Sequence, residues 1–171
     1  ITINAKNSGT LSRLILGLLI NSNHTIKLIG DKSLSKRDFK RISDPLSRFG
    51  AKFKLNKNKH LPLRITGSSQ LRPIKYIENK GSAQCKSSVI FGGIRAPGTT
   101  FIRAKKSRNH TEILAKYLKL PIQIKNKKNY DEIEVKKINK IKPINYNIPS
   151  DISSSAFFIV LTALSKDSEL L

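Results

Sequence analysis

The sequence predicts an α/β fold built from repeated units of about 70 residues. Two observations carry this prediction. Hydroxyl-rich turns that open apolar helices recur at a fixed interval, because Ser8 and Ser82 are 74 residues apart and Thr25 and Thr99 are also 74 residues apart. Each turn leads into the same order of elements, which is helix, strand, helix, strand and strand, behind a short extended segment. Side-chain identity between the copies is low, so the repeat is one of pattern.

In the first copy, the turn Asn7-Ser8-Gly9-Thr10 precedes apolar residues at helical spacing, with Asn or Ser as the expected N-cap. A second helix is predicted to end at Gly50, a residue typical of helix C-termini. After the first helix, the predicted strand, charged loop, helix and two strands cover residues 25–29, 30–36, 37–49, 51–55 and 63–66.

The second copy repeats this order. Its helix, strand, charged loop, helix and two strands are predicted over 82–97, 99–104, 105–109, 110–120, 122–125 and 132–138. A third copy begins with an apolar helix at Asp151, and the extended segments in front of the three copies are 1–4, 74–78 and 144–148. Because helix N-termini carry free N–H groups and a positive dipole end, these starts favour an anionic ligand.

Composition restricts the function. The 171 residues hold 33 Lys+Arg and 11 Asp+Glu, a net charge of +22, which suggests nucleic acid, an acidic membrane surface or phosphorylated small molecules as partners. The lysines are dispersed beside Ile and Asn, a mixture that an AT-rich genome also produces. One cysteine and three histidines exclude an internal disulfide framework and disfavour a zinc site. We therefore expect a cytoplasmic protein with no metal, no cofactor and no membrane segment.

Five motifs resemble those of the 5-enolpyruvylshikimate-3-phosphate (EPSP) synthase family, and they occur in the family's order over nearly the whole chain. They are Asn7-Ser8-Gly9-Thr10 with Arg13, Gly30-Asp31-Lys32-Ser33-Leu34-Ser35-Lys36-Arg37, Gly81-Ser82-Ala83-Gln84-Cys85-Lys86-Ser87, Ser107-Arg108-Asn109-His110-Thr111-Glu112 and Asp151-Ile152-Ser153-Ser154-Ser155-Ala156-Phe157. Any one of these motifs is weakly specific, whereas the ordered set is strongly specific.

The resemblance implies a fold of two lobes, each built from inverse α/β units. Residues 1–149 would form two units of the first lobe, divided into 1–72 and 73–149, and residues 150–171 would start the second lobe. The implied reaction transfers the enolpyruvyl group of phosphoenolpyruvate to the 5-hydroxyl of shikimate 3-phosphate, in the shikimate pathway to aromatic amino acids. The general base would belong to the rest of the second lobe, so this partial chain is expected to contain no catalytic residue and to be inactive alone.

The resemblance also implies ligand residues. It assigns phosphoenolpyruvate to Gly9, Arg37 and Gln84, and shikimate 3-phosphate to Ser82, Ala83, Gln84, Ser107 and Arg108. Supporting roles are implied for Asn7, Thr10, Arg13 and Asp151. Taken alone, Gly9 reads as a turn glycine, Arg37 as a solvated arginine, and Ser82 and Ser107 as N-caps.

Two positions depart from the family pattern, because Asp38 stands where Pro is usual and Asn109 where Asp is usual. Asp38 is expected to weaken the neighbouring Arg37 as a phosphate ligand.

Three alternatives stay open. The chain could be similar to UDP-N-acetylglucosamine enolpyruvyl transferases, whose reactive loop cysteine has no good counterpart in Cys85, one turn into an apolar helix. It could be a nucleic-acid-binding module, although it contains no RRM, KH or helix-turn-helix motif and few aromatic residues. It could also be a non-catalytic remnant. We expect small anionic substrates, no specific nucleic acid, no membrane and a monomeric full-length protein.

Overall fold

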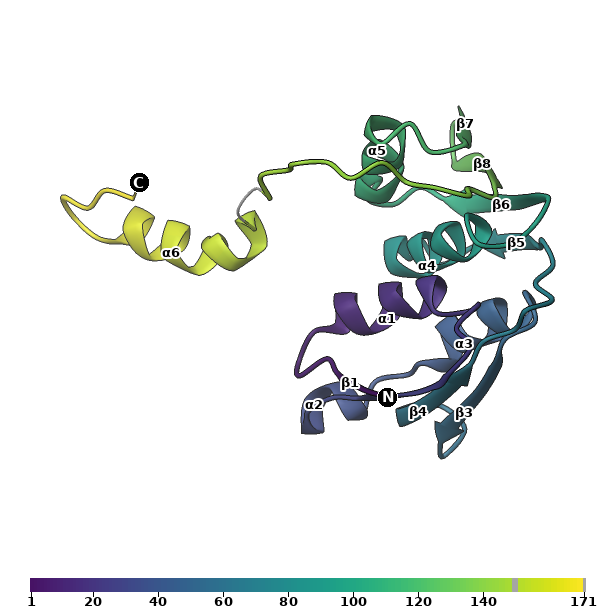
Figure 1. The fold of residues 1–171 in the computed structure, drawn as a ribbon. Helices are drawn as coiled ribbons and strands as arrows, with labels where there is room; N and C mark the ends of the chain where they lie inside the picture. Colours follow the sequence, from purple (N-terminus) through teal and green to yellow (C-terminus); the bar gives the residue numbers. More distant parts are fainter. Residues whose placement is uncertain (149–150, 171) are drawn as a thin grey trace. The chain divides into compact units, whose positions relative to one another are not determined.

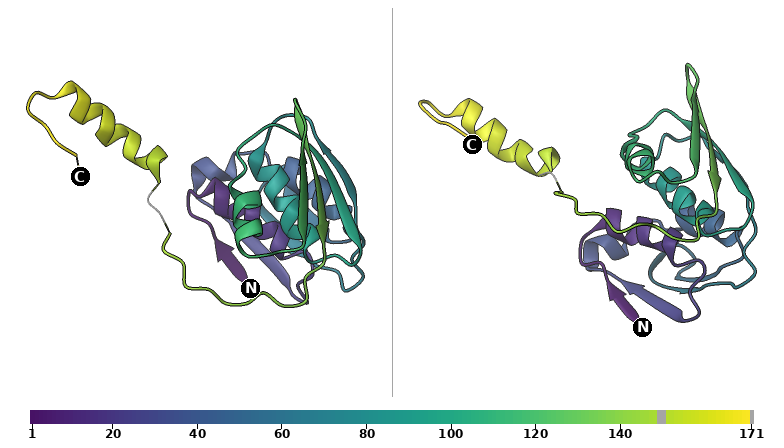
Figure 2. Two further views of the ribbon diagram at one scale, coloured as in Figure 1. Left: turned by 90° about the horizontal axis from the view of Figure 1, so that it is seen from above. Right: turned by 45° about the horizontal axis from the view of Figure 1, so that its top comes forward.

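A computed structural model of the chain describes residues 1–148 and 151–170. These residues form a compact unit over 1–141 and a second unit over 142–171. The compact unit contains two four-stranded sheets with helices between them, which confirms the predicted α/β class (Figures 1 and 2). No helix in the described ranges has the length and apolar character needed to cross a membrane.

The two sheets have the same topology. The first has the strand order β1-β2-β4-β3 and the second β5-β6-β8-β7, and in each the first pair is parallel and the other two are antiparallel. The first repeat contains β1 (Thr2–Asn4), α1 (Gly9–Leu18), β2 (Thr25–Ile29), α2 (Lys32–Ser35), α3 (Lys40–Ser47), β3 (Lys52–Asn56) and β4 (His60–Thr66). The second contains β5 (Lys75–Glu78), α4 (Ala83–Gly93), β6 (Thr99–Lys105), α5 (His110–Tyr117), β7 (Ile122–Asn126) and β8 (Tyr130–Lys136).

Helices α1 and α4 run side by side between the sheets, in a register equal to the repeat period (Figure 1). Near their N-termini, Gln84 Nε2 donates to Thr10 Oγ1 at 2.8 Å. Beyond their C-termini, Arg95 Nε donates to Asn21 Oδ1 at 3.0 Å. Both bonds join residues 74 positions apart. The sequence interval therefore reappears as contact between equivalent positions of two parallel helices.

Glycines allow close packing at two points, between α1 and α4 and between α4 and Phe49, which follows α3. A Cβ added at Gly17 would overlap the carbonyl oxygen of Ser88, and one at Gly92 would lie 2.9 Å from Cε2 of Phe49. Buried residues of both repeats, including Leu16, Phe49, Val89 and Val135, consequently form one hydrophobic core.

Two predictions about local structure are wrong. The segment 30–36 is not only a loop, because the Asp31 carboxylate accepts the N–H of Leu34 and caps the single turn α2. The next helix begins at Lys40 rather than at residue 37, because the Asp38 carboxylate accepts the N–H of Lys40 at 2.7 Å. That helix ends at Ser47, and Gly50, at φ +119°, follows as the chain turns into β3.

The extended segment predicted at 144–148 forms no strand. The corresponding β1 and β5 are strands because each pairs in parallel with the next strand of its repeat. No strand is described in 142–148 or 151–170, so this segment has no such partner there. The predicted third helix is confirmed as α6 (Ile152–Leu164), which is apolar on all sides and largely exposed in the second unit. The assignment of 1–72, 73–149 and 150–171 to two lobes stays a prediction.

We expect Gly17→Ala to destabilise the chain by about 1–3 kcal/mol, the usual cost of overpacking a closely packed core. The added methyl would force α1 away from the Ser88 carbonyl. Urea unfolding followed by circular dichroism measures this change. Leu18→Ala, at the adjacent and 43% exposed position, is the control and should change stability by well below about 1 kcal/mol. Equal effects of the two substitutions would contradict the proposed tight contact.

Candidate functional site

Two arginines face the turn that begins the first repeat's helix. Ser8 Oγ accepts the N–H of Leu11 at 3.1 Å, and α1 begins at Gly9. A Cβ added at Gly9 would lie 2.7 Å from Nη1 of Arg37 and 3.2 Å from Nη1 of Arg13. The absence of a side chain at Gly9 therefore lets both guanidinium groups approach a helix N-terminus. Such a group of donors is suited to an anion.

These two arginines have no carboxylate partner. Within the described ranges, the ion pairs closer than 4.0 Å are Lys86–Glu112 and Lys106–Asp131. Partial burial, and then the nearby positive charge of Arg37, lower the pKa of Arg13 below its usual value. The Arg13 guanidinium also lies 5.8 Å from the centroid of the Phe39 ring. A bound anion would relieve the repulsion between the two arginines.

The acidic residues near this cluster bind backbone N–H groups instead. The Asp31 carboxylate accepts Asn7 Nδ2 at 2.5 Å and the N–H of Leu34 at 2.7 Å, and these two bonds lower its pKa, Asn7 contributing most. Asp38 caps Lys40 and forms no ion pair with Arg37. No Asp38–Arg37 ion pair therefore supports the expectation that Asp38 weakens Arg37 as a phosphate ligand. Asn7, assigned a supporting role, ties the first turn to the segment that carries Arg37.

Gln84 connects this cluster to the second repeat. Its Oε1 accepts Arg13 Nη1 at 2.6 Å while its Nε2 donates to Thr10 Oγ1 at 2.8 Å. Ser88 Oγ, one turn further along α4, donates to the carbonyl oxygen of Arg13 at 2.7 Å. The side chains of Thr10 and Arg13, both assigned supporting roles, are therefore held by α4.

A cavity of about 150 Å³ opens on the other side of Gln84. It brings together three residues predicted to bind shikimate 3-phosphate, which are Ala83, Gln84 and Arg108. The N-terminal parts of α1, α4 and α5 all contribute to its lining, which also includes Thr10, Leu14, Ser87, His110 and Thr111. The Arg108 guanidinium and the starts of α4 and α5 in the lining make this cavity a second candidate site for an anion.

Ser82 and Ser107 lie outside the lining of this cavity. Ser82 Oγ accepts the N–H of Cys85 at 3.3 Å, so its reading as an N-cap is confirmed. Ser107 lines a separate cavity of about 240 Å³, where its buried Oγ has no hydrogen-bond partner among residues 1–148 and 151–170. Its reading as an N-cap is wrong, because Asn109 occupies that position of α5. The structure thus separates Ser107 from Arg108.

Asp151 lies in the second unit and caps α6. Its carboxylate accepts the N–H of Ser153 at 3.0 Å and the hydroxyl of Ser154 at 2.8 Å. The Ser154 bond first, and the Ser153 bond next, lower the pKa of Asp151.

Sequence reasoning missed three buried carboxylates, which are Glu78, Glu112 and Asp131, and a buried lysine. Glu78 accepts the N–H groups of Lys80 and Ser82, at 3.2 and 2.9 Å, and so shapes the turn before α4. Lys86 is fully buried, 2.5 Å from Glu112. The sequence feature that could have identified Lys86 and Glu112 is their place within two of the five motifs.

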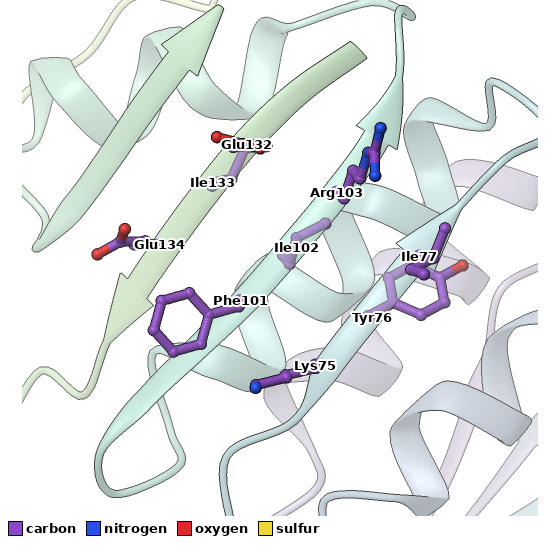
Figure 3. A pocket seen from close by; sticks show the side chains of 9 residues that line it. All are labelled: Lys75, Tyr76, Ile77, Phe101, Ile102, Arg103, Glu132, Ile133 and Glu134. Atoms are coloured by element: carbon purple, nitrogen blue, oxygen red, sulfur yellow. The ribbon is translucent and has the colours of Figure 1, made fainter.

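Another cavity, of about 290 Å³, lies on the face of the second sheet that carries the exposed Ile77 and Phe101. Figure 3 shows its side chains, which come from β5, β6 and β8 and include Glu132 and Glu134. Lys75 and Arg103 balance the charge of these two carboxylates, and none of the predicted ligand residues lines the cavity. Across residues 1–148 and 151–170, no three His, Cys, Asp or Glu side chains are grouped to hold a metal ion.

Comparisons with known proteins agree with the motifs. The family model of EPSP synthase (3-phosphoshikimate 1-carboxyvinyltransferase) matches residues 1–171. Relatives of that name from Caldicellulosiruptor bescii and Clostridium tetani are each 41% identical to this chain, covering 98% and 99% of it but only 39% and 37% of their own lengths. The chain therefore spans less than two fifths of these relatives.

Solved structures give the same result. EPSP synthase from Acinetobacter baumannii is 34% identical and matches 98% of this chain and 37% of its own, with a TM-score of 0.79. The enolpyruvyl transferase NikO from Streptomyces tendae, 15% identical, covers 72% of this chain and 29% of its own with a TM-score of 0.51, which shows a shared fold. The ordered motifs, the repeat topology and these matches over the whole chain together establish that it belongs to the EPSP synthase family.

Proposed function

We propose that this chain supplies part of the substrate site of an enzyme that transfers the enolpyruvyl group of phosphoenolpyruvate to the 5-hydroxyl of shikimate 3-phosphate. The observation that carries the proposal is the pair of adjacent cationic sites joined by Gln84. A reaction between two anions needs two such sites side by side. The assembled enzyme would be a cytoplasmic monomer in the shikimate pathway, acting on small anionic substrates without a cofactor.

Phosphoenolpyruvate would bind at the cluster of Gly9, Arg13 and Arg37. The two unpaired guanidinium groups match its phosphate and carboxylate, and the N–H groups at the start of α1 add further donors. Gly9 permits the close approach that this arrangement requires. Gln84 would hold Arg13 in place and contact both substrates from its position between them.

Shikimate 3-phosphate would bind in the cavity lined by Ala83, Gln84 and Arg108. The start of α4 and the Arg108 guanidinium would hold its phosphate. The hydroxyls of Thr10 and Thr111, which bond to Gln84 and Ser87, also lie in the lining and could share these bonds with the ring hydroxyls. Ser82 and Ser107 would contribute less, because the Ser82 hydroxyl caps α4 and Ser107 lines a different cavity.

In the proposed reaction, the 5-hydroxyl oxygen of shikimate 3-phosphate bonds to C2 of the enolpyruvyl group and gives its proton to a general base. The bond between that carbon and the phosphate oxygen breaks, and inorganic phosphate leaves. The residues of this chain would bind and orient the two anions and stabilise their charge. The general base would come from outside this chain, as the family resemblance implies.

Arg37→Ala should weaken phosphoenolpyruvate binding by about tenfold or more, because it removes a charge-assisted contact worth roughly 1.5–3 kcal/mol. Shikimate 3-phosphate binding should change far less. NMR titration of the ¹⁵N-labelled chain with each ligand separately measures both affinities. Arg64→Ala is the matched control, since it removes an equal charge from an exposed position of β4. Equal losses from Arg37→Ala and Arg64→Ala would show that only net charge matters.

The 171-residue chain alone should not release phosphate from a mixture of the two substrates, because we place the general base outside it. A coupled phosphate assay over several hours checks this, with a full-length relative as the positive control. Sustained release above the protein-free rate would contradict the assignment of the base.

A second candidate function, nucleic-acid binding, is favoured by one observation. Register places Lys27 and Lys54 on either side of Arg64 in one row across the first sheet, beside a groove of about 490 Å³. Strands β1–β4 contain no acidic residue. This face would attract any polyanion, but it offers no exposed aromatic side chain for base stacking.

We expect DNA binding to be sequence-independent and to weaken to micromolar or beyond at physiological salt, since log K falls by roughly 0.9 per contacted phosphate for each decade of salt. Fluorescence anisotropy with two unrelated duplexes, measured from low to physiological salt, tests this. Nanomolar, sequence-selective binding at physiological salt would support the nucleic-acid function instead.

A further inference from the structure

The buried ion pair between Lys86 and Glu112 has no role in the proposed substrate site described above. Lys86 Nζ lies 2.5 Å from Glu112 Oε1, and the two side chains are 0% and 5% exposed. Within the described residues, neither Lys86 Nζ nor Glu112 Oε2 has a hydrogen-bond partner, so the two side chains interact as a charge pair. Burial of two charges is unfavourable unless close pairing and further hydrogen bonds offset the loss of their hydration.

The position of α5 depends strongly on this pair. The buried residues of α5 are Glu112 and Ala115, whereas its large apolar side chains Ile113, Leu114 and Tyr117 are 57%, 39% and 60% exposed. Hydrophobic burial therefore contributes little to holding this helix. Next to the ion pair, the hydroxyls of Ser87 and Thr111 form a hydrogen bond of 2.7 Å. Two consecutive residues of α4 thus bind two consecutive residues of α5.

Arg108 lies in the short segment between β6 and α5, and this segment is fixed on both sides. On the β6 side, Lys106 Nζ binds Asp131 Oδ1 at 2.7 Å. On the α5 side, Glu112 binds Lys86, which lies two residues after Gln84 in α4. Both α4 and the Arg108 segment line the cavity proposed for shikimate 3-phosphate.

We propose that Lys86 and Glu112 are positioning residues, which hold the start of α5 against α4 so that Arg108 faces Ala83 and Gln84. They touch no substrate themselves, and the inference rests on the proposed binding of shikimate 3-phosphate in that cavity. We expect the effect to be local, because Gly9 is approached by Arg13 and Arg37 of the first repeat, whereas Lys86 pairs with Glu112 of the second.

Glu112→Gln separates positioning from simple electrostatics, because the two predict opposite signs. Removing a negative charge near an anion site should strengthen anion binding if electrostatics alone act. If the pair positions Arg108, the same substitution should weaken shikimate 3-phosphate binding by about tenfold, the loss expected for one charge-assisted contact. Phosphoenolpyruvate affinity should remain within about twofold of the unsubstituted chain, because its site lies elsewhere.

The experiment is an NMR titration of the ¹⁵N-labelled 171-residue chain with each ligand, using the Arg108 Nε–H signal as a local reporter. Glu134→Gln is the matched control, since it removes a carboxylate from the same repeat without touching α4, and it should leave both affinities unchanged. The double variant Lys86→Met/Glu112→Gln removes both charges, so it leaves no unpaired buried charge and should keep its melting temperature. Its shikimate 3-phosphate affinity should stay reduced.

Each result has a defined meaning. Weaker shikimate 3-phosphate binding with unchanged phosphoenolpyruvate binding, in both Glu112→Gln and the double variant, supports the positioning role. Unchanged or stronger shikimate 3-phosphate binding, or equal losses for the two ligands, overturns it while the proposed function stands. If the unsubstituted chain binds no shikimate 3-phosphate at millimolar concentration, the proposed use of the cavity fails first, and the positioning role fails with it.

Discussion

The close contact between α1 and α4 is the constraint on which the rest of the compact unit depends. Gly17 lets the α1 backbone reach the Ser88 carbonyl, and Ser88 in turn donates its hydroxyl to the carbonyl oxygen of Arg13. At this separation the Gln84 amide can bind Arg13 and Thr10 together. A wider spacing would break these bonds and separate the two cationic sites, although each repeat could keep its own sheet. The packing of two helices therefore sets the geometry of the proposed substrate site.

A second constraint concerns the acidic residues near the site. Asp31, Asp38 and Glu78 all lie close to residues proposed to bind substrate, yet each carboxylate accepts backbone N–H groups at a turn or helix start. These hydrogen bonds fix the backbone of the segments that carry Arg37 and Ser82. None of the three carboxylates forms an ion pair within 4.0 Å in the described residues. The arginines remain available to anions, while the backbone around them is fixed.

Much of this arrangement could be predicted from the sequence because it is local. Helical spacing and the 74-residue interval predicted the repeat, and the hydroxyl-rich turns identified the starts of α1 and α4. The prediction failed where a side chain changes the backbone, as Asp31 and Asp38 do around α2 and α3, or where an extended segment lacks a partner strand, as at 144–148. The buried Lys86–Glu112 pair and the direction of Ser107 depend on how α5 packs, and neither periodicity nor capping patterns contain that information.

The repeat explains why there are two cationic sites. In each copy, a hydroxyl-capped helix start lies near an arginine from the segment before α3 or α5, which gives Gly9 with Arg37 in the first copy and Ala83 with Arg108 in the second. Because α1 and α4 are parallel and in register, these two equivalent pairs of helix start and arginine lie next to each other, with Gln84 between them. Two copies of one anion-binding pattern, placed side by side, are what a reaction between two anions requires. The sequence repeat would thus provide one anion-binding site for each of the two proposed substrates.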